Sequence, residues 1–241
     1  CPFCTPAPLH RASASNGSIP YGRITVPFQT GLASYDEFVE FIRRARRPGE
    51  SWALLPGAWN PPTRAHLQLA RAALEHAGEL VFVLPRAFPH KDFSGPGLET
   101  RAEWLGRLAA LDPAFSAALS DGGLFLEMAR EARRAGAREV WIVCGADAAE
   151  RIANWPYPPG SEIERQLEDE YGLLVAPRLA DWNPPPHLAR RVRFLPVEDS
   201  LQEISSSQVR RLLAAGLPWR HLVPEEIAAE IARAYGSSCP V

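Results

Sequence analysis

Short apolar runs alternate with helical patterns along most of this chain, and this alternation constrains its fold more than any other feature. The runs lie at residues 52–55, 79–84, 139–145, 172–176 and 192–197. Helical periodicity follows residue 66 and recurs over residues 99–111, 122–135, 161–170, 206–215 and 224–234. Continuously apolar strands are typical of parallel sheets that helices cover on both faces. The sequence therefore predicts an α/β fold with a doubly wound, mostly parallel sheet.

The first fifty residues do not follow this alternation. Residues 1–20 are rich in Pro, Ser and Ala without periodicity, whereas residues 34–47 have the spacing of an amphipathic helix. We therefore expect an N-terminal extension over residues 1–50 with one helix, followed by a single domain over residues 51–236. Cys1 and Cys4 form a C-x-x-C pair near His10, but the sequence offers no fourth ligand at a suitable spacing, so we expect no metal site.

Charge and hydropathy argue against two classes of partner. The formal net charge of the 241 residues is −2 at pH 7, which gives no overall attraction to nucleic acid or to anionic membranes. The sequence contains no apolar stretch of the roughly 20 residues that cross a bilayer, and its start lacks the apolar core of a signal peptide. We expect a cytoplasmic protein that binds neither nucleic acid nor membrane, and the sequence is compatible with a homo-oligomer.

The most informative local segment follows the first strand. Residues 57–66 read Gly-Ala-Trp-Asn-Pro-Pro-Thr-Arg-Ala-His and lead directly into a helical pattern. A strand, a turn with small residues and a helix start bring backbone N–H groups and the helix dipole to bear on a phosphate. Thr63 and His66 lie about one turn apart, so their side chains can face the same bound group. We interpret this segment as part of a nucleotide site.

Polar residues also follow the next two strands. Arg86, His90 and Lys91 lie in the long loop after residues 79–84, and Lys91 is the only lysine in a total of 26 Lys and Arg residues. Gly145-Ala146-Asp147 ends the strand over residues 139–145. Ligands of doubly wound sheets bind outside the carboxyl ends of the strands. We therefore expect these loops and the turn over residues 57–66 to surround one site.

A second pattern suited to phosphate opens a late helix. Residues 204–210 read Ile-Ser-Ser-Ser-Gln-Val-Arg. One serine at such a position can simply cap the helix. Three consecutive hydroxyls followed one turn later by Arg210 also combine N–H groups, O–H donors and a fork-shaped cation around an anion.

Together, the two segments resemble the paired signatures of the nucleotidyltransferase superfamily, an H/T-x-G-H turn after the first strand and an I-S-S-T-x-x-R late helix. Within it, the chain is most similar to nicotinate/nicotinamide mononucleotide adenylyltransferases. Further matches are Pro89-His90-Lys91, Gly145-Ala146-Asp147 with Trp155 downstream, and Leu222-Val223-Pro224-Glu225. The resemblance covers about residues 52–235 and implies a Rossmann-like nucleotidyltransferase fold.

The resemblance also implies a reaction of NAD biosynthesis: AMP passes from ATP to nicotinate or nicotinamide mononucleotide, pyrophosphate leaves and a dinucleotide forms. It implies that Mg²⁺ is held mainly by the ATP phosphates. The residues that it assigns to catalysis are His66, Thr63 and Arg210. Those that it assigns to ATP are Gly57, Ala58, Trp59, Asn60, His66, Gly145, Asp147, Ile204, Ser205, Ser206, Ser207 and Arg210. Those that it assigns to the acceptor are His90, Lys91, Asp147 and Trp155, of which Trp155 stacks on the pyridine ring.

The chain departs from the family pattern mainly in the turn. Ala58 and Trp59 stand where Gly or Ser and then Phe are common, Thr63 replaces the more frequent first histidine, and Ala65 replaces the glycine before His66. The Ser/Thr-Tyr-Thr stretch of bacterial nicotinate enzymes is not recognisable around residues 122–127. Two alternatives therefore stay open: another nucleotidyltransferase, of the cytidylyltransferase or phosphopantetheine type, or a nucleotide-binding regulator without catalysis.

Overall fold

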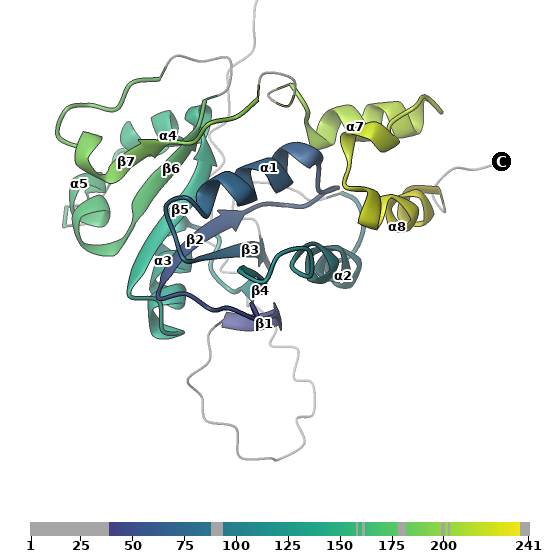
Figure 1. Cartoon of the computed structure of the whole chain (residues 1–241). Coiled ribbons are helices and arrows are strands. Elements are labelled where there is room, and N and C mark those ends of the chain that lie inside the picture. The colour runs from purple at the N-terminus through teal and green to yellow at the C-terminus, as the bar shows by residue number, and fades with distance from the viewer. Residues whose placement is uncertain are drawn as a thin grey trace, which may run out of the picture. The chain divides into compact units, whose positions relative to one another are not determined.

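A seven-stranded sheet of order β1-β4-β3-β2-β5-β6-β7 forms the centre of the molecule (Figure 1). The structure is a computed structural model, and it describes residues 39–87, 94–157, 159–160, 162–177, 182–198, 201 and 203–236. The strands are β1 (Val39–Arg43), β2 (Ser51–Pro56), β3 (Glu79–Pro85), β4 (Phe115–Ser120), β5 (Glu139–Gly145), β6 (Gly172–Ala176) and β7 (Val192–Phe194). All neighbours pair in parallel except β1, which is antiparallel to β4. The predicted fold class is confirmed.

Helices cover both faces of this sheet and bury a separate apolar cluster on each. The helices on the face toward the viewer in Figure 1 are α1 (Arg64–Ala73), α2 (Leu98–Leu108), α7 (Ser206–Ala214) and α8 (Glu225–Gly236). The helices on the opposite face are α3 (Phe125–Arg134), α4 (Ala146–Ala153), α5 (Ile163–Arg165) and the π-helical turn Gln166–Glu170 that continues α5. Short 3₁₀ turns at Ala189–Arg191 and Arg220–Leu222 precede β7 and α8.

The order of the strands reverses at β2. The chain passes from β2 through α1 to β3 on one side, and β5 pairs with β2 on the other side. In open α/β sheets, such a switch point leaves a crevice at the carboxyl ends of the two strands because their connections leave in opposite directions. The fold therefore places a ligand-sized opening beside the ends of β2 and β5.

The predicted helix over residues 34–47 is wrong, because residues 39–43 form the edge strand β1. Phe41 and Ile42 pack into the clusters on opposite faces of the sheet. Because neighbouring residues of this strand are apolar on both faces, apolar and polar residues do not alternate along it, and alternation is the pattern by which a strand is recognised. The apolar residues then have a spacing that resembles that of a helix. Since β1 precedes residue 51, the sheet begins upstream of the boundary that we predicted for the folded domain.

The sequence did not predict β4. Its six residues, Phe-Ser-Ala-Ala-Leu-Ser, include no β-branched side chain, and alanine is depleted in strands. All six are nevertheless buried, because β4 lies between β1 and β3 and has helices on its faces. Burial in the sheet, rather than local propensity, therefore determines this strand.

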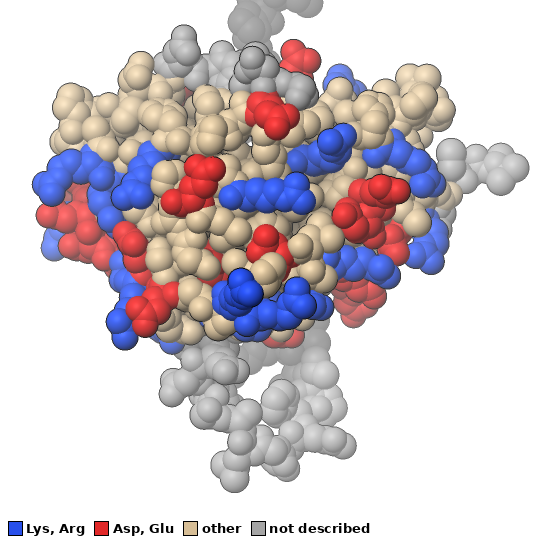
Figure 2. Space-filling model, in the orientation of Figure 1, with Lys and Arg blue, Asp and Glu red and all other residues tan. Residues whose placement is uncertain are grey.

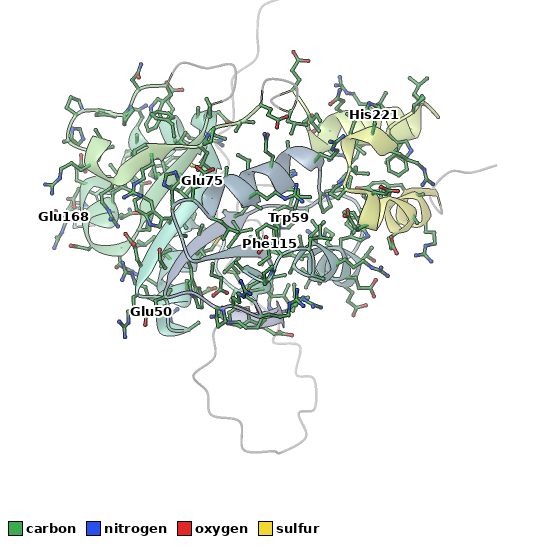
Figure 3. The ribbon with its side chains drawn as sticks, viewed as in Figure 1. Glu50, Trp59, Glu75, Phe115, Glu168 and His221 are labelled. Atoms are coloured by element: carbon green, nitrogen blue, oxygen red, sulfur yellow. The ribbon has the colours of Figure 1, made fainter. Side chains whose placement is uncertain are left out.

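Apart from the buried Glu79, Arg101 and Glu131, the charged residues that the structure describes are at least partly exposed. On the face drawn in Figure 2, acidic and basic side chains are interspersed, as a formal net charge of −2 leads one to expect. Trp59 and Phe115 lie inside the fold (Figure 3), where each is at most 2% exposed. Among the residues that the structure describes, no helix is long and apolar enough to cross a membrane.

Candidate nucleotide site

A cavity of about 340 Å³ opens at the carboxyl ends of the central strands, at the switch point. Pro56 ends β2, Gly145 ends β5 and Ala176 ends β6, and all three line the cavity. The remaining wall comes from α1, from Pro177, Val197 and Leu201, and from the start of α7. Its lining residues are Leu55, Pro56, Ala65, His66, Leu69, Val143, Cys144, Gly145, Ala176, Pro177, Val197, Leu201, Ile204, Ser205, Ser206 and Ser207. Two segments that the sequence singled out, about 140 positions apart, thus meet in one cavity.

His66 is held in one tautomer at the cavity wall. The backbone N–H of Thr63 donates to its Nδ1 at 3.0 Å, and Oγ1 of Thr63 lies 2.7 Å from the same atom. Because a backbone N–H can only donate, Nδ1 accepts and the ring proton is on Nε2. The donor of the His66 ring is therefore Nε2–H.

Thr63 acts on this site through His66. Its side chain is fully buried, and its hydroxyl lies at the imidazole. The family resemblance implied that this hydroxyl assists catalysis, and in the structure its neighbour is the imidazole of His66. The structure makes Thr63 the N-cap of α1 and the residue that orients the imidazole.

Trp59 lies in the core and not in the cavity wall. Its side chain is 2% exposed, its Nε1 donates to the carbonyl of Val83 at 2.8 Å, and its ring contacts Phe82 edge-on. The ring also lies 5.1 Å from that of His66. Trp59 has a φ of +53°, a left-handed conformation that is uncommon for a bulky residue. The indole thus packs against the imidazole and lies outside the cavity wall.

The backbone of the turn is fixed by donors from two helices. Each carbonyl of residues 58, 60 and 61 accepts a hydrogen bond from a side chain of α2 or α7. The pairs are Arg101 Nη1 with Ala58 at 3.0 Å, Arg210 Nη1 with Asn60 at 2.5 Å, and Ser206 Oγ with Pro61 at 2.7 Å. Gly57 is joined to β3 by its N–H, which donates to Val83 at 3.1 Å. The turn is therefore held in position without a ligand.

The start of α7 presents several donors to the cavity. Ser205 is the N-cap and accepts from the N–H of Gln208 at 3.2 Å, and Ser207 accepts from Nη2 of Arg210 at 3.2 Å. Both hydroxyls keep their own proton for donation. The hydroxyl of Ser206 donates to Pro61, so only its backbone N–H is suited to a phosphate. Ile204 is a buried apolar part of the wall.

Gly145 and Asp147 join β5 to α4. A Cβ added at Gly145 would lie 2.7 Å from Oδ1 of Asp147, so the Asp147 carboxylate lies close to the backbone of Gly145. Asp147 itself is exposed and lies 3.8 Å from Arg151 in an ion pair. Trp155 follows α4 and is 52% exposed. These two residues are outside the cavity wall, on the α4 side of the site.

Sequence reasoning missed Cys144, which also lines the cavity. Burial raises the pKa of its thiol to about 12, and the charge of Asp147 adds to this rise. Ala176 and Pro177 were missed as well, although the end of the predicted strand over residues 172–176 could have indicated them. His90 and Lys91, which were predicted to bind the acceptor, lie outside the described residues.

The sheet order, the histidine turn and the serine-rich helix start around one cavity define a nucleotidyltransferase. A model of the cytidylyltransferase-like family matches residues 54–212. The chain belongs to this family, and its resemblance to nucleotidyltransferases is confirmed.

Within this family, the chain is similar to curated proteins named as nicotinate-nucleotide adenylyltransferases. A probable nicotinate-nucleotide adenylyltransferase of Symbiobacterium thermophilum is 33% identical over 201 residues, which are 75% of this chain and 91% of the relative. One of Stenotrophomonas maltophilia is 28% identical over 213 residues, 73% of this chain and 91% of the relative. Among solved structures, Plasmodium falciparum nicotinic acid mononucleotide adenylyltransferase complexed with NaAD superposes with a TM-score of 0.57 at 14% identity, over 77% of this chain and 97% of that one. That superposition supports the fold.

Proposed function

We propose that this protein transfers AMP from ATP to nicotinate mononucleotide, with nicotinamide mononucleotide as the alternative acceptor, and releases pyrophosphate. The observation that carries this proposal is the single cavity in which His66, Gly145 and the serines of α7 meet. The names of the relatives support adenylyl transfer and favour the nicotinate acceptor. We expect the reaction to belong to NAD biosynthesis and to take place in the cytoplasm.

In this proposal, His66 stabilises charge on the α-phosphate. A phosphate oxygen of the acceptor attacks the α-phosphorus, and the bond from that phosphorus to the oxygen that bridges to the β-phosphate breaks. Nε2–H of His66 donates to a non-bridging oxygen on which charge builds in the transition state. The hydroxyl of Thr63 and the indole of Trp59 hold the imidazole in place, so little reorganisation is needed when charge develops.

The leaving pyrophosphate is bound at the start of α7. Ser205 and Ser207 offer hydroxyl protons, the first turn of the helix offers N–H groups, and Arg210 adds a positive charge. Arg210 uses two of its five N–H donors on Asn60 and Ser207, which leaves others for phosphate oxygens. These donors stabilise the negative charge that the leaving pyrophosphate gains as its bond to the α-phosphorus breaks.

Mg²⁺ would enter with ATP. The cavity wall offers hydroxyls, an imidazole and backbone amides, which can donate hydrogen bonds to phosphate oxygens. Mg²⁺ prefers charged oxygen ligands, so the phosphates themselves would hold it. When bound, the ion would neutralise charge on the phosphates.

The acceptor nucleotide would lie on the α4 side. There the exposed ring of Trp155 offers a surface for a pyridine, and the carboxylate of Asp147 can accept hydrogen bonds from sugar hydroxyls. A role of His90 and Lys91 at the acceptor remains a prediction.

Pyrophosphate release tests the proposal. Purified protein with Mg²⁺ is given ATP or CTP together with each of nicotinate mononucleotide, nicotinamide mononucleotide, phosphopantetheine and phosphocholine. We expect release with ATP and nicotinate mononucleotide. Release with CTP but not ATP would instead indicate a cytidylyltransferase, and ATP binding without turnover of any acceptor would indicate a regulator.

A further inference from the structure

Asn60 joins the phosphate turn to three other parts of the fold. Its side-chain Nδ2 donates to the carbonyl of Ser94 at 2.9 Å, its backbone carbonyl accepts from Arg210 at 2.5 Å, and its Oδ1 accepts from the hydroxyl of Tyr235. Asn60 is only 7% exposed, so water cannot easily replace a lost partner. A Cβ added at Gly95 would lie 2.7 Å from the Asn60 amide, which shows how closely the chain packs there. The conformation of the turn therefore depends on partners of Asn60 outside the turn.

Tyr235 is the partner that comes from the last helix. Its ring stacks on the fully buried Trp104 of α2, with 6.4 Å between centroids and 17° between planes. An ion pair of 3.2 Å between Arg107 and Glu230 also joins α2 to α8. Burial raises the pKa of Tyr235 well above its ordinary value, so the phenol stays protonated and donates to Asn60. α8 lies beyond residues 54–212, which the family model matches.

We propose that Tyr235 is a positioning residue of the adenylyl-transfer site, which acts through Asn60. Its hydroxyl fixes the Asn60 amide, and Asn60 in turn fixes the carbonyl to which Arg210 is bound. Loss of the hydroxyl would let the turn shift relative to Arg210 and His66, and small displacements of catalytic groups lower rates strongly. This inference rests on the proposed function, because it concerns the alignment of the same phosphate-binding groups.

The test compares Tyr235→Phe with a matched tyrosine. Tyr171 is fully buried at 1% exposed, whereas Tyr235 is half-buried, and the Tyr171 hydroxyl likewise donates to a side-chain amide oxygen, Oε1 of Gln166 at 3.0 Å. Tyr171 precedes β6, whose far end reaches the cavity, so Tyr171→Phe removes a similar hydrogen bond away from the site. Both variants are measured in the full chain for thermal stability, for kcat and KM with ATP and nicotinate mononucleotide, and for ATP affinity by titration.

We expect Tyr235→Phe to lower kcat about tenfold and to raise the KM and Kd of ATP about threefold. Its Tm should change by about as much as that of Tyr171→Phe, whereas the kcat and KM of Tyr171→Phe should stay at the wild-type values. In an Asn60→Ala background, or Asn60→Ser if the alanine variant does not fold, Tyr235→Phe should have no further effect. A kcat within twofold of the wild type, or a full additional loss in that background, would overturn the inference.

A wild type that turns over no acceptor would refute the proposed function and not this inference. ATP affinity then decides. If Tyr235→Phe weakens ATP binding in the wild-type background but not in the Asn60 variant, Tyr235 acts through Asn60. If Tyr235→Phe leaves ATP binding unchanged, the inference is overturned.

Discussion

Replacing Trp59 by phenylalanine should destabilise the protein and leave ATP binding almost unchanged. The indole is 2% exposed, donates to the carbonyl of Val83 at 2.8 Å and lies edge-on to Phe82 at 5.6 Å between ring centroids. None of these contacts faces the cavity, whose lining does not include Trp59. The family pattern places this residue in the ATP site, so the two interpretations predict different outcomes.

The expected magnitude follows from the contacts that are lost. The hydrogen bond contributes about 1 kcal/mol, because Val83 keeps a second donor, the N–H of Gly57 at 3.1 Å, and is not left unpaired. The smaller ring buries less apolar area and leaves a void, which costs about 1–2 kcal/mol. Trp59→Phe should therefore lower the free energy of unfolding by about 2–3 kcal/mol, or the Tm by about 4–12 °C for a domain of this size.

Urea unfolding followed by circular dichroism gives the stability, and the KM of ATP comes from the pyrophosphate assay. Trp104→Phe is the matched control: Trp104 is fully buried, but its Nε1 has no hydrogen-bond partner among the residues that the structure describes. That variant should lose about 1 kcal/mol less, since only ring contacts disappear. An unchanged stability of Trp59→Phe together with a tenfold higher KM for ATP would refute the placement of the indole in the core.

Two further predictions concern the cavity wall. With a pKa of about 12, Cys144 is a thiolate in only about 10⁻⁴ of molecules at pH 8. The test uses a variant in which Cys1, Cys4 and Cys239 are replaced by serine, so that Cys144 is the thiol that reacts. Iodoacetamide should alkylate Cys144 about 10³ times more slowly than an accessible thiol. A rate within tenfold of that in the unfolded chain would contradict this prediction. Thr63→Val keeps the side-chain shape and the N–H bond to Nδ1, so nitrogen NMR of His66 should still show the Nε2–H form while kcat falls about tenfold. A shift to the Nδ1–H form would show that the hydroxyl, rather than the backbone, sets the tautomer.

Much of this architecture follows from local sequence. The runs that became β2, β3 and β5 are continuously apolar because both faces of each strand are covered by helices. Since the carboxyl ends of parallel strands lie on one edge, the positions of His66 and Gly145 at the same edge of the sheet could be predicted from the parallel sheet alone. The serine-rich start of α7 required the family signature as well.

Other features depend on distant partners and leave no local signal. Trp59 occupies a turn that is suited to phosphate, and only the packing of β3 beneath it shows that the ring is buried. Asn60 and Tyr235 are 175 positions apart, and nothing near either residue indicates their hydrogen bond. The hydroxyl of Ser206 is a further example, because the carbonyl to which it donates belongs to Pro61, in the other half of the site.

We propose that His66 acts on the transferred phosphate from a preformed site, and the rate of dinucleotide formation by His66→Ala tests this role most directly. The product is quantified by mass spectrometry with saturating ATP, Mg²⁺ and nicotinate mononucleotide, and the Tm is measured on the same samples. The loss of a charge-stabilising donor should lower kcat by about 10²-fold or more, with a Tm within a few degrees of the wild type. A kcat within threefold of the wild type, or unfolding of the variant, would contradict this role of His66.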